Sequence, residues 1–173
     1  MMNSRMTVVV IVAIATFPLV IFAADKKQTP SEAAKHFTVR AYGGAPINFE
    51  KKYLEKDIRE IGRIANYKAE EDRNGTLIVL DDNDMFHEKN GYRVNDCKFL
   101  DFHLIKTSVH FNDINKLKET LTQFGEPTNK DEKDWRMQKW DFPDVNRHIE
   151  IYIDGHSLIV ETWDEYKHRT AHQ

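Results

Sequence analysis

The stretch from residue 148 to residue 163 constrains the fold most, because it holds the clearest turn signal in the chain. Two segments of alternating side chains, HIEIYID and SLIVETW, flank Asp154-Gly155. Asp and Gly at the two central positions of a tight turn both tolerate positive φ. The pattern therefore predicts a β-hairpin whose loop is closed by residues 153 and 156.

This register sorts the side chains of the predicted hairpin onto two faces. Ile149 faces Val160 and Ile151 faces Leu158, which gives one aliphatic face suited to a core. The other face mixes charged, aromatic and apolar groups: His148, Glu150, Tyr152, Ser157, Ile159, Glu161 and Trp163. A mixed face of this kind indicates either a second, partly covered layer or a recognition surface.

An amphipathic helix is predicted immediately before the hairpin region. Asn112 or Asp113 can cap its N-terminus, and Gly125 with Pro127 two residues later can end it. The apolar residues recur at spacings of three and four and are Ile114, Leu117, Leu121 and Phe124. We expect this stripe to pack against the aliphatic face of the hairpin.

A second helix is predicted to begin at Asn48 and to end near Asn66. Its apolar face would hold Leu54, Ile58, Ile61 and Ile64 or Ala65. A charged turn, AEEDRNG, and a buried strand, TLIVL, would follow.

Further strands are expected at residues 36–41, in KFLDFHLIK and in SVHFN, with a turn at Asn90-Gly91. The chain is therefore predicted to be an α+β protein, with an antiparallel sheet of about five to seven strands and two helices packed on one face. Residues 49–80 and 111–163 share the order of helix followed by strand, through either duplication or coincidence.

The N-terminus predicts export. Residues 1–24 carry one positive charge, at Arg5, followed by an uncharged apolar run that Pro18 interrupts and Ala23-Ala24 ends. This is typical of a signal peptide, with an uncleaved membrane anchor as the alternative. We expect a polar arm at 25–36, one domain at 37–166 and a polar tail at 167–173, in the periplasm or secreted.

The balance of charged residues narrows the class of partner. Without the leader, 24 basic residues stand against 28 acidic ones. This balance argues against nucleic acid or an anionic membrane as the main partner and is compatible with a basic protein.

Cys97 is the single cysteine, so no intramolecular disulfide can form, and we expect it to be a small, at least partly buried residue.

The C-terminal third resembles a known fold. The helix, Phe124-Gly125-Glu126-Pro127, the two tryptophans Trp135 and Trp140, and IEIYIDGHSLIVET resemble the fold of small protein A and the β-lactamase-inhibitor protein, over residues 112–163. Phe124 stands where Leu is usual, and the lipidation cysteine of the outer-membrane members is missing. The resemblance implies a non-enzymatic domain that binds another protein through its sheet face.

Motifs for catalysis or metal binding are weak. The eight histidines are scattered, without an HExxH motif, and those at 103, 110, 148 and 156 are interpreted as solvated or capping residues. The acidic run at 81–84 departs from a calcium loop at Met85 and Phe86. We expect no catalytic residue, cofactor or metal site.

The function predicted from the sequence is binding to a protein in the periplasm, as an immunity or inhibitor protein that neutralises a basic toxin or enzyme. A structural envelope-assembly component of small-protein-A type is the alternative, and a small periplasmic hydrolase or ligand carrier is the third. An acidic loop can steer a basic partner, and aromatic side chains often carry binding energy. The candidate contact residues are Asp81, Asp82, Asp84, Tyr152, Ile159 and Trp163.

Overall fold

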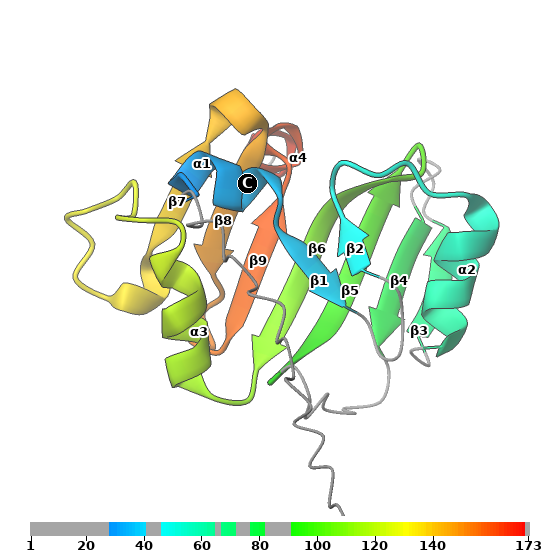
Figure 1. Ribbon diagram of the computed structural model, residues 1–173, viewed down its shortest axis with the longest axis horizontal. Coiled ribbons are helices and arrows are strands. Elements are labelled where there is room, and N and C mark those ends of the chain that lie inside the picture. Colours follow the sequence, from blue (N-terminus) through cyan, green and yellow to red (C-terminus); the bar gives the residue numbers. More distant parts are fainter. Residues whose placement is uncertain (1–27, 41–45, 65–66, 72–76, 82–90, 172–173) are drawn as a thin grey trace, which may run out of the picture.

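The computed structural model describes residues 28–40, 46–64, 67–71, 77–81 and 91–171. Its main element is a seven-stranded antiparallel sheet with the order β3-β4-β5-β6-β9-β8-β7 (Figure 1). The strands are β3 Tyr67–Glu71, β4 Leu77–Asp81, β5 Tyr92–Leu100, β6 His103–Phe111, β7 Lys139–Phe142, β8 Arg147–Ile151 and β9 Ser157–Glu161. The predicted α+β class is confirmed.

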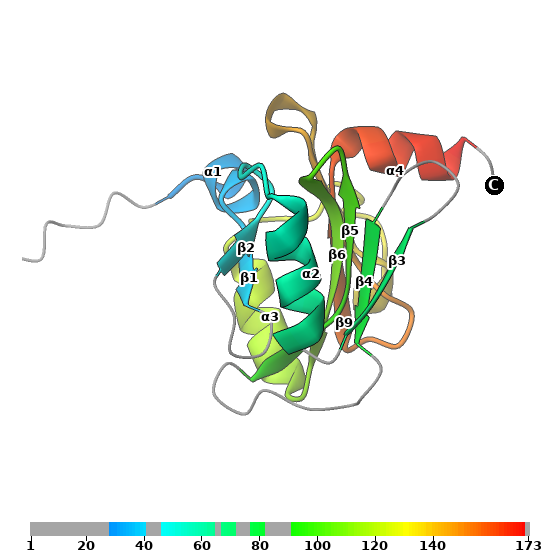
Figure 2. The same ribbon diagram turned by 90° about the vertical axis from the view of Figure 1, so that its right-hand side faces the viewer.

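Helices cover both faces of this sheet. Figure 2 shows α1, α2, α3 and a small β1-β2 sheet on one face, and α4 on the other. Their bounds are α1 Pro30–Lys35, β1 Thr38–Arg40, β2 Pro46–Asn48, α2 Glu55–Ile64, α3 Ile114–Thr122 and α4 Trp163–Thr170, with short 3₁₀ turns η1 Trp135–Met137 and η2 Pro143–Val145. Two helices on one face were expected. The two additional helices, α1 and α4, come from segments interpreted as a polar arm and as the hairpin end and tail.

The sheet consists of two meanders that meet at its centre. One runs from β3 to β6 after α2, and the other from β7 to β9 after α3. The antiparallel pairing of β6 with β9 joins them, with Val109 opposite Leu158. The two units noticed in the sequence therefore occupy the two halves of one sheet.

The C-terminal hairpin has the predicted register. Ile149 pairs with Val160 and Ile151 with Leu158. These four side chains belong to the buried core, which they share with Leu117, Leu121 and Phe124 from the α3 region. Asp113 caps α3 through its side chain, and Gly125 takes the left-handed conformation at φ +71°. Both the helix and its stop signal are thus confirmed.

The second helix is shorter than predicted. α2 begins at Glu55, because the preceding residues form β2 and a turn in which the Asn48 side chain accepts hydrogen bonds from the backbone of residues 50 and 51. Asn, Asp, Ser and Thr side chains offer the backbone this alternative to helix. Leu54 consequently lies outside the helix and is exposed, whereas Ile58 is buried.

Two further local predictions need correction or extension. Part of the expected charged turn AEEDRNG lies in β3, which pairs with β4. The expected strands in residues 98–112 are β6 and part of β5, and the turn between them places Asp101 and Phe102 at φ +48° and +66°. The Asn90-Gly91 turn lies partly outside the described residues, and Gly91 has φ +70°.

Cys97 lies in the core, as its type suggested. It is fully buried beside Thr107, with the two side-chain atoms Sγ and Oγ1 3.5 Å apart. Burial raises the pKa of the thiol to about 12. Low thiolate content makes this cysteine a packing residue and a poor nucleophile.

The predicted signal peptide or membrane anchor lies in residues that the structure does not describe. Within the described ranges, no helix combines the length and apolar character required to cross a bilayer. The predicted leader at 1–24 lies outside those ranges.

Candidate functional site

The loop between β8 and β9 differs in detail from the predicted two-residue turn. It is closed by Tyr152 and Ser157, because the Tyr152 N–H donates to the Ser157 carbonyl at 2.8 Å. Inside it, the Gly155 N–H donates to the Tyr152 carbonyl at 2.8 Å, and Gly155 has φ +69°. The register is unchanged, but the loop is longer than expected.

The Asp154 side chain organises this loop. Its Oδ1 accepts from the backbone N–H groups of His156 and Ser157, each at 2.8 Å, and its Oδ2 accepts from the Ser157 hydroxyl at 2.8 Å. Partial burial alone would raise the pKa of Asp154, but these hydrogen bonds lower it below its usual value. The loop is therefore held in one shape by its own side chain.

Exposed apolar side chains gather at this loop. Tyr152 is 51% exposed, Ile153 71% and Met137 53%. Met137 comes close because the Ile151 N–H donates to the carbonyl of the neighbouring Gln138 at 3.3 Å. We call Met137, Tyr152 and Ile153, together with Trp135 and Arg136, the hairpin-loop surface.

An open depression of about 720 Å³ lies beside these residues. Trp135, Arg136 and Asp134 line one side of it, and Gly155 with His156 lines the other. Arg136 is fixed by a fork-like ion pair with Asp134, in which the shortest N–O distance is 2.7 Å. Trp, Tyr and Arg are the residue types that most often carry binding energy at protein interfaces.

Among the predicted contact residues whose side chains the structure describes, Tyr152, Ile159 and Trp163 do not form one exposed surface. Tyr152 is at the loop end of the hairpin, whereas Trp163 begins α4 at the other end of β9. Ile159 lies between them in the strand and is only 7% exposed. Asp81 is the last residue of β4, and Asp82 and Asp84 fall outside the described residues.

Helix α4 covers part of the mixed face of the hairpin. Tyr166 stacks on the ring of His148, with ring centroids 3.7 Å apart and planes 15° from parallel. Trp163 lies 6.2 Å from the same histidine ring. Of the two interpretations of this face, the structure shows a partly covered second layer at the end that His148 and Glu161 occupy.

Beneath α4 lies a polar group of side chains that we call the α4 cluster: Asp141, His148, Glu150, Glu161 and Arg169. His148 and Glu161 are fully buried, so the interpretation of His148 as a solvated or capping residue is wrong. One guanidinium nitrogen of Arg169, Nη2, donates to Glu150 Oε1 and Glu161 Oε1, each at 2.7 Å. His148 Nδ1 donates to Asp141 Oδ1 at 2.6 Å.

Two members of the α4 cluster, Glu150 and Arg169, have pKa values shifted by their neighbours. Burial would raise the pKa of Glu150, but the hydrogen bond with His148 and the charge of Arg169 bring it below its usual value. Burial would lower the pKa of Arg169, and the contacts with Glu161 and Glu150 raise it instead. Glu150 and Arg169 therefore stabilise each other's charged forms.

One signal in the sequence could have revealed that a helix, α4, covers the mixed face of the hairpin. Thr162 and Glu165 have the spacing of a helix N-terminal cap, and the Thr162 hydroxyl accepts from the Glu165 N–H at 3.2 Å. A helix starting there places Arg169 eight residues after Glu161. The pairing with Glu150 depends on the position of α4 against the sheet.

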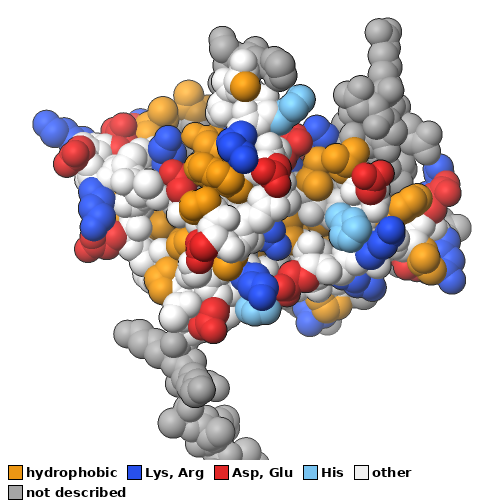
Figure 3. Space-filling model, turned by 90° about the horizontal axis from the view of Figure 1, so that it is seen from above, with side chains coloured by type: hydrophobic (Ala, Val, Ile, Leu, Met, Phe, Trp, Pro, Cys, Tyr) orange, Lys and Arg blue, Asp and Glu red, His pale blue; other side chains and the backbone are white. Residues whose placement is uncertain are grey.

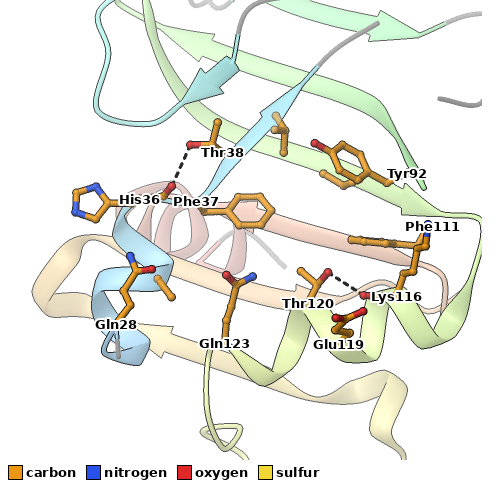
Figure 4. A pocket seen from close by; sticks show the side chains of 13 residues that line it. Gln28, His36, Phe37, Thr38, Tyr92, Phe111, Lys116, Glu119, Thr120 and Gln123 are labelled. Atoms are coloured by element: carbon orange, nitrogen blue, oxygen red, sulfur yellow. Dashed lines mark hydrogen bonds between the residues drawn. The ribbon is translucent and has the colours of Figure 1, made fainter. Parts of the chain in front are cut away.

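A separate pocket of about 510 Å³ lies on the face of the sheet that α1 and α3 cover, opposite to α4 (Figure 4). Phe37, Tyr92 and Phe111 supply aromatic groups, and Thr120 of α3 and its C-cap residue Gln123 form part of the polar edge. Its volume falls within the range of small-molecule sites.

The end of the molecule near α1 and α4 is mixed in character. Seen from above, hydrophobic groups alternate with acidic and basic side chains, and neither sign of charge dominates that view (Figure 3). The net negative charge of the chain is thus not concentrated there.

Comparisons with known proteins supply no family or relative. No protein-family model, curated protein or solved structure matches this chain. The function must therefore be argued from the described residues themselves.

Proposed function

We propose that this chain is an exported protein-binding domain that acts as an immunity or inhibitor protein and binds its target through the hairpin-loop surface. The observation that carries the proposal is the exposure of Tyr152 and Ile153 on a loop already fixed by Asp154. Export rests on the apolar N-terminal sequence, and a basic toxin or enzyme remains the expected partner because the chain is acidic.

Preorganisation is the physical reason for choosing this loop. Ordering a flexible loop or side chain on binding costs free energy, so a loop fixed beforehand retains more of its contact energy. The depression beside Trp135 and Arg136 could accept a side chain from the partner, and Tyr152 and Ile153 are exposed on the same loop as its lining residues Asp154 to His156. This arrangement has the aromatic and arginine content of an interface centre.

The test is capture of a partner by the epitope-tagged full-length chain, expressed in its own organism and cross-linked before purification. We expect one stoichiometric protein, and we expect the double variant Tyr152→Ser/Ile153→Ser to lose it. The matched control is Leu54→Ser/Phe102→Ser, which also replaces one aliphatic and one aromatic exposed residue. Circular dichroism and thermal melting check that both variants fold.

The results separate the candidate functions. A partner that the wild type and the control retain, and that the loop variant loses, supports the hairpin-loop surface. Inhibition of that partner's activity by the purified chain then supports the inhibitor class. Equal retention by both variants contradicts the proposed surface, and enrichment of outer-membrane assembly proteins instead favours the envelope component.

A ligand carrier is a second candidate because of the pocket in Figure 4. Its aromatic and aliphatic lining with a polar edge suits a small amphipathic molecule. Mass spectrometry of the natively purified chain tests this idea. A bound small molecule that is displaced by Thr120→Trp, a change at the partly exposed edge of the pocket, favours the carrier.

A further inference from the structure

We propose that the α4 cluster binds one divalent transition-metal ion, Zn²⁺ being the first to test, through His148 Nε2 and one carboxylate oxygen each of Glu150 and Glu161. The site is independent of the hairpin-loop surface and goes beyond protein binding. It also departs from the sequence analysis, which predicted no metal site.

The three donor groups already converge. One potential ligand atom from each of His148, Glu150 and Glu161 lies within 4.8 Å of the other two. Ligands about 2.0 to 2.2 Å from a tetrahedral Zn²⁺ stand roughly 3.4 Å apart. His148 Nε2 and Glu150 Oε2 are 3.3 Å apart in a hydrogen bond, so a metal ion that replaced the shared proton would find this pair at that spacing.

The second nitrogen of His148 is held as in many metal sites. Metal-bound histidines usually donate their other ring N–H to a carboxylate or carbonyl, which fixes the ring and the tautomer. His148 Nδ1 is 2.6 Å from Asp141 Oδ1. This bond leaves Nε2 as the nitrogen directed at the two glutamates.

An unsatisfied oxygen provides independent support. Glu161 is fully buried, and its Oε2 has no hydrogen-bond partner among the residues that the structure describes, although its Oε1 accepts from Arg169. Buried polar atoms nearly always have a partner, and a bound cation would supply one to this oxygen. Because Arg169 uses Oε1 of both glutamates, a cation bound to the opposite oxygens would not have to displace it.

The net charge of the α4 cluster favours binding of a cation in addition to the Arg169 guanidinium. Among the side chains in direct contact within the α4 cluster, three carboxylates face the single positive charge of Arg169 when His148 is neutral. Lys139 lies close by, but its Nζ contacts the Tyr166 hydroxyl at 3.4 Å. A nitrogen ligand selects transition metals over Ca²⁺ and Mg²⁺, which take oxygen ligands.

The experiment is calorimetric titration of the full-length chain, stripped with a chelator, with Zn²⁺ and separately with Ca²⁺. We expect one Zn²⁺ per chain, a higher melting temperature with Zn²⁺, and no binding of Ca²⁺ at this site. Co²⁺ in place of Zn²⁺ should give visible ligand-field absorption, which reports nitrogen and oxygen ligation directly and needs no variant.

Two variants locate the ion and one controls for surface binding. Glu161→Gln removes a ligand charge at nearly constant shape, and Asp141→Asn removes the support of His148; we expect Zn²⁺ affinity to fall about 10- to 100-fold in each. The control is His36→Gln, because His36 forms an exposed pair with Glu50 at 2.8 Å and should leave Zn²⁺ affinity unchanged.

Three results would overturn the proposal. The first is absence of Zn²⁺ binding by the wild type up to about 1 mM, which corresponds to a very weak site. The second is equal Zn²⁺ affinity in Glu161→Gln, Asp141→Asn and the wild type. The third is loss of binding in His36→Gln alone, which would identify an adventitious surface ion only.

Discussion

The two faces of the β8-β9 hairpin are built from alternating residues of the same two strands but are stabilised in opposite ways. On one face, Ile149, Leu158 and Val160 are completely buried among apolar side chains. On the other, His148 and Glu161 are also completely buried, but among ion pairs and aromatic rings that α4 supplies. Burial alone therefore does not distinguish the two faces.

The difference lies in how strictly each face depends on its partners. Hydrophobic burial is non-directional, and many apolar neighbours can supply it. A buried carboxylate needs a specific cation or donor, because an unpaired buried charge costs several kcal/mol. The aliphatic face should thus respond to loss of volume, and the face under α4 to loss of one partner.

The largest loss of stability is expected from a substitution on the aliphatic face. Leu158→Ala leaves a cavity where a fully buried side chain packs, and it should lower the free energy of unfolding by about 2 to 5 kcal/mol. Urea denaturation followed by circular dichroism measures the change. Ile153→Ala, at an exposed position, is the control and should change stability by less than about 0.5 kcal/mol.

A somewhat smaller effect is expected under α4. Arg169→Ala removes the guanidinium that neutralises Glu150 and Glu161, and it should cost about 2 to 3 kcal/mol. The value is below that of a fully enclosed ion pair because the Arg169 side chain is 28% exposed. The same denaturation assay measures it, together with hydrogen exchange of the α4 amides.

The control for this variant is Lys167→Ala on the same helix. Lys167 forms an exposed pair with Asp164, so its loss should change stability by less than about 1 kcal/mol. If Arg169→Ala were no more damaging than Lys167→Ala, the comparison between the two faces would break down. α4 would then be held by its aromatic contacts alone.

The smallest effect is expected at the loop that joins the two strands. Because folding lowers the pKa of Asp154, its charged form contributes stability above the unfolded pKa of about 3.8, and this contribution is lost as pH falls through the lower folded value. Asp154→Ala should cost about 1 kcal/mol at pH 7. The gap between the two proteins should narrow steadily as pH falls below about 4.

Melting temperatures of both proteins between pH 7 and pH 2 measure this gap. A gap that stays constant with pH would show that Asp154 acts through its shape and not through its charge. A reduced capture of the protein partner by Asp154→Ala at pH 7 would further link loop order to the proposed binding surface.

Local patterns predicted the regions that depend on short-range chemistry. The capped helix α3, the left-handed Gly125 and the pairing of Ile149 with Val160 follow from residues that are near one another in the chain. Where a nearby side chain competed with the pattern, the prediction was wrong. At Asn48, hydrogen bonds to the following backbone replaced the first turns of the expected helix.

The candidate sites were less accessible to such reasoning. Tyr152 was predicted from its place on the mixed face, but Met137 lies in η1, well before it in the sequence, and is brought toward the loop by the backbone hydrogen bond from Ile151 to Gln138. The α4 cluster combines residues of β7, β8, β9 and α4. Periodicity reports which face a residue occupies and not what covers that face.

By itself, the sequence determined the α+β class, the hairpin register, the helix that packs on it and the burial of Cys97. Only the tertiary structure decided that α4 folds over the mixed face, that His148 and Glu161 are buried together, and that Tyr152 and Ile153 remain exposed. The physical reason is the separation along the chain over which each kind of interaction acts. Turn chemistry and amphipathic spacing act over a few residues, whereas ion pairs and covered surfaces depend on where distant segments come to rest.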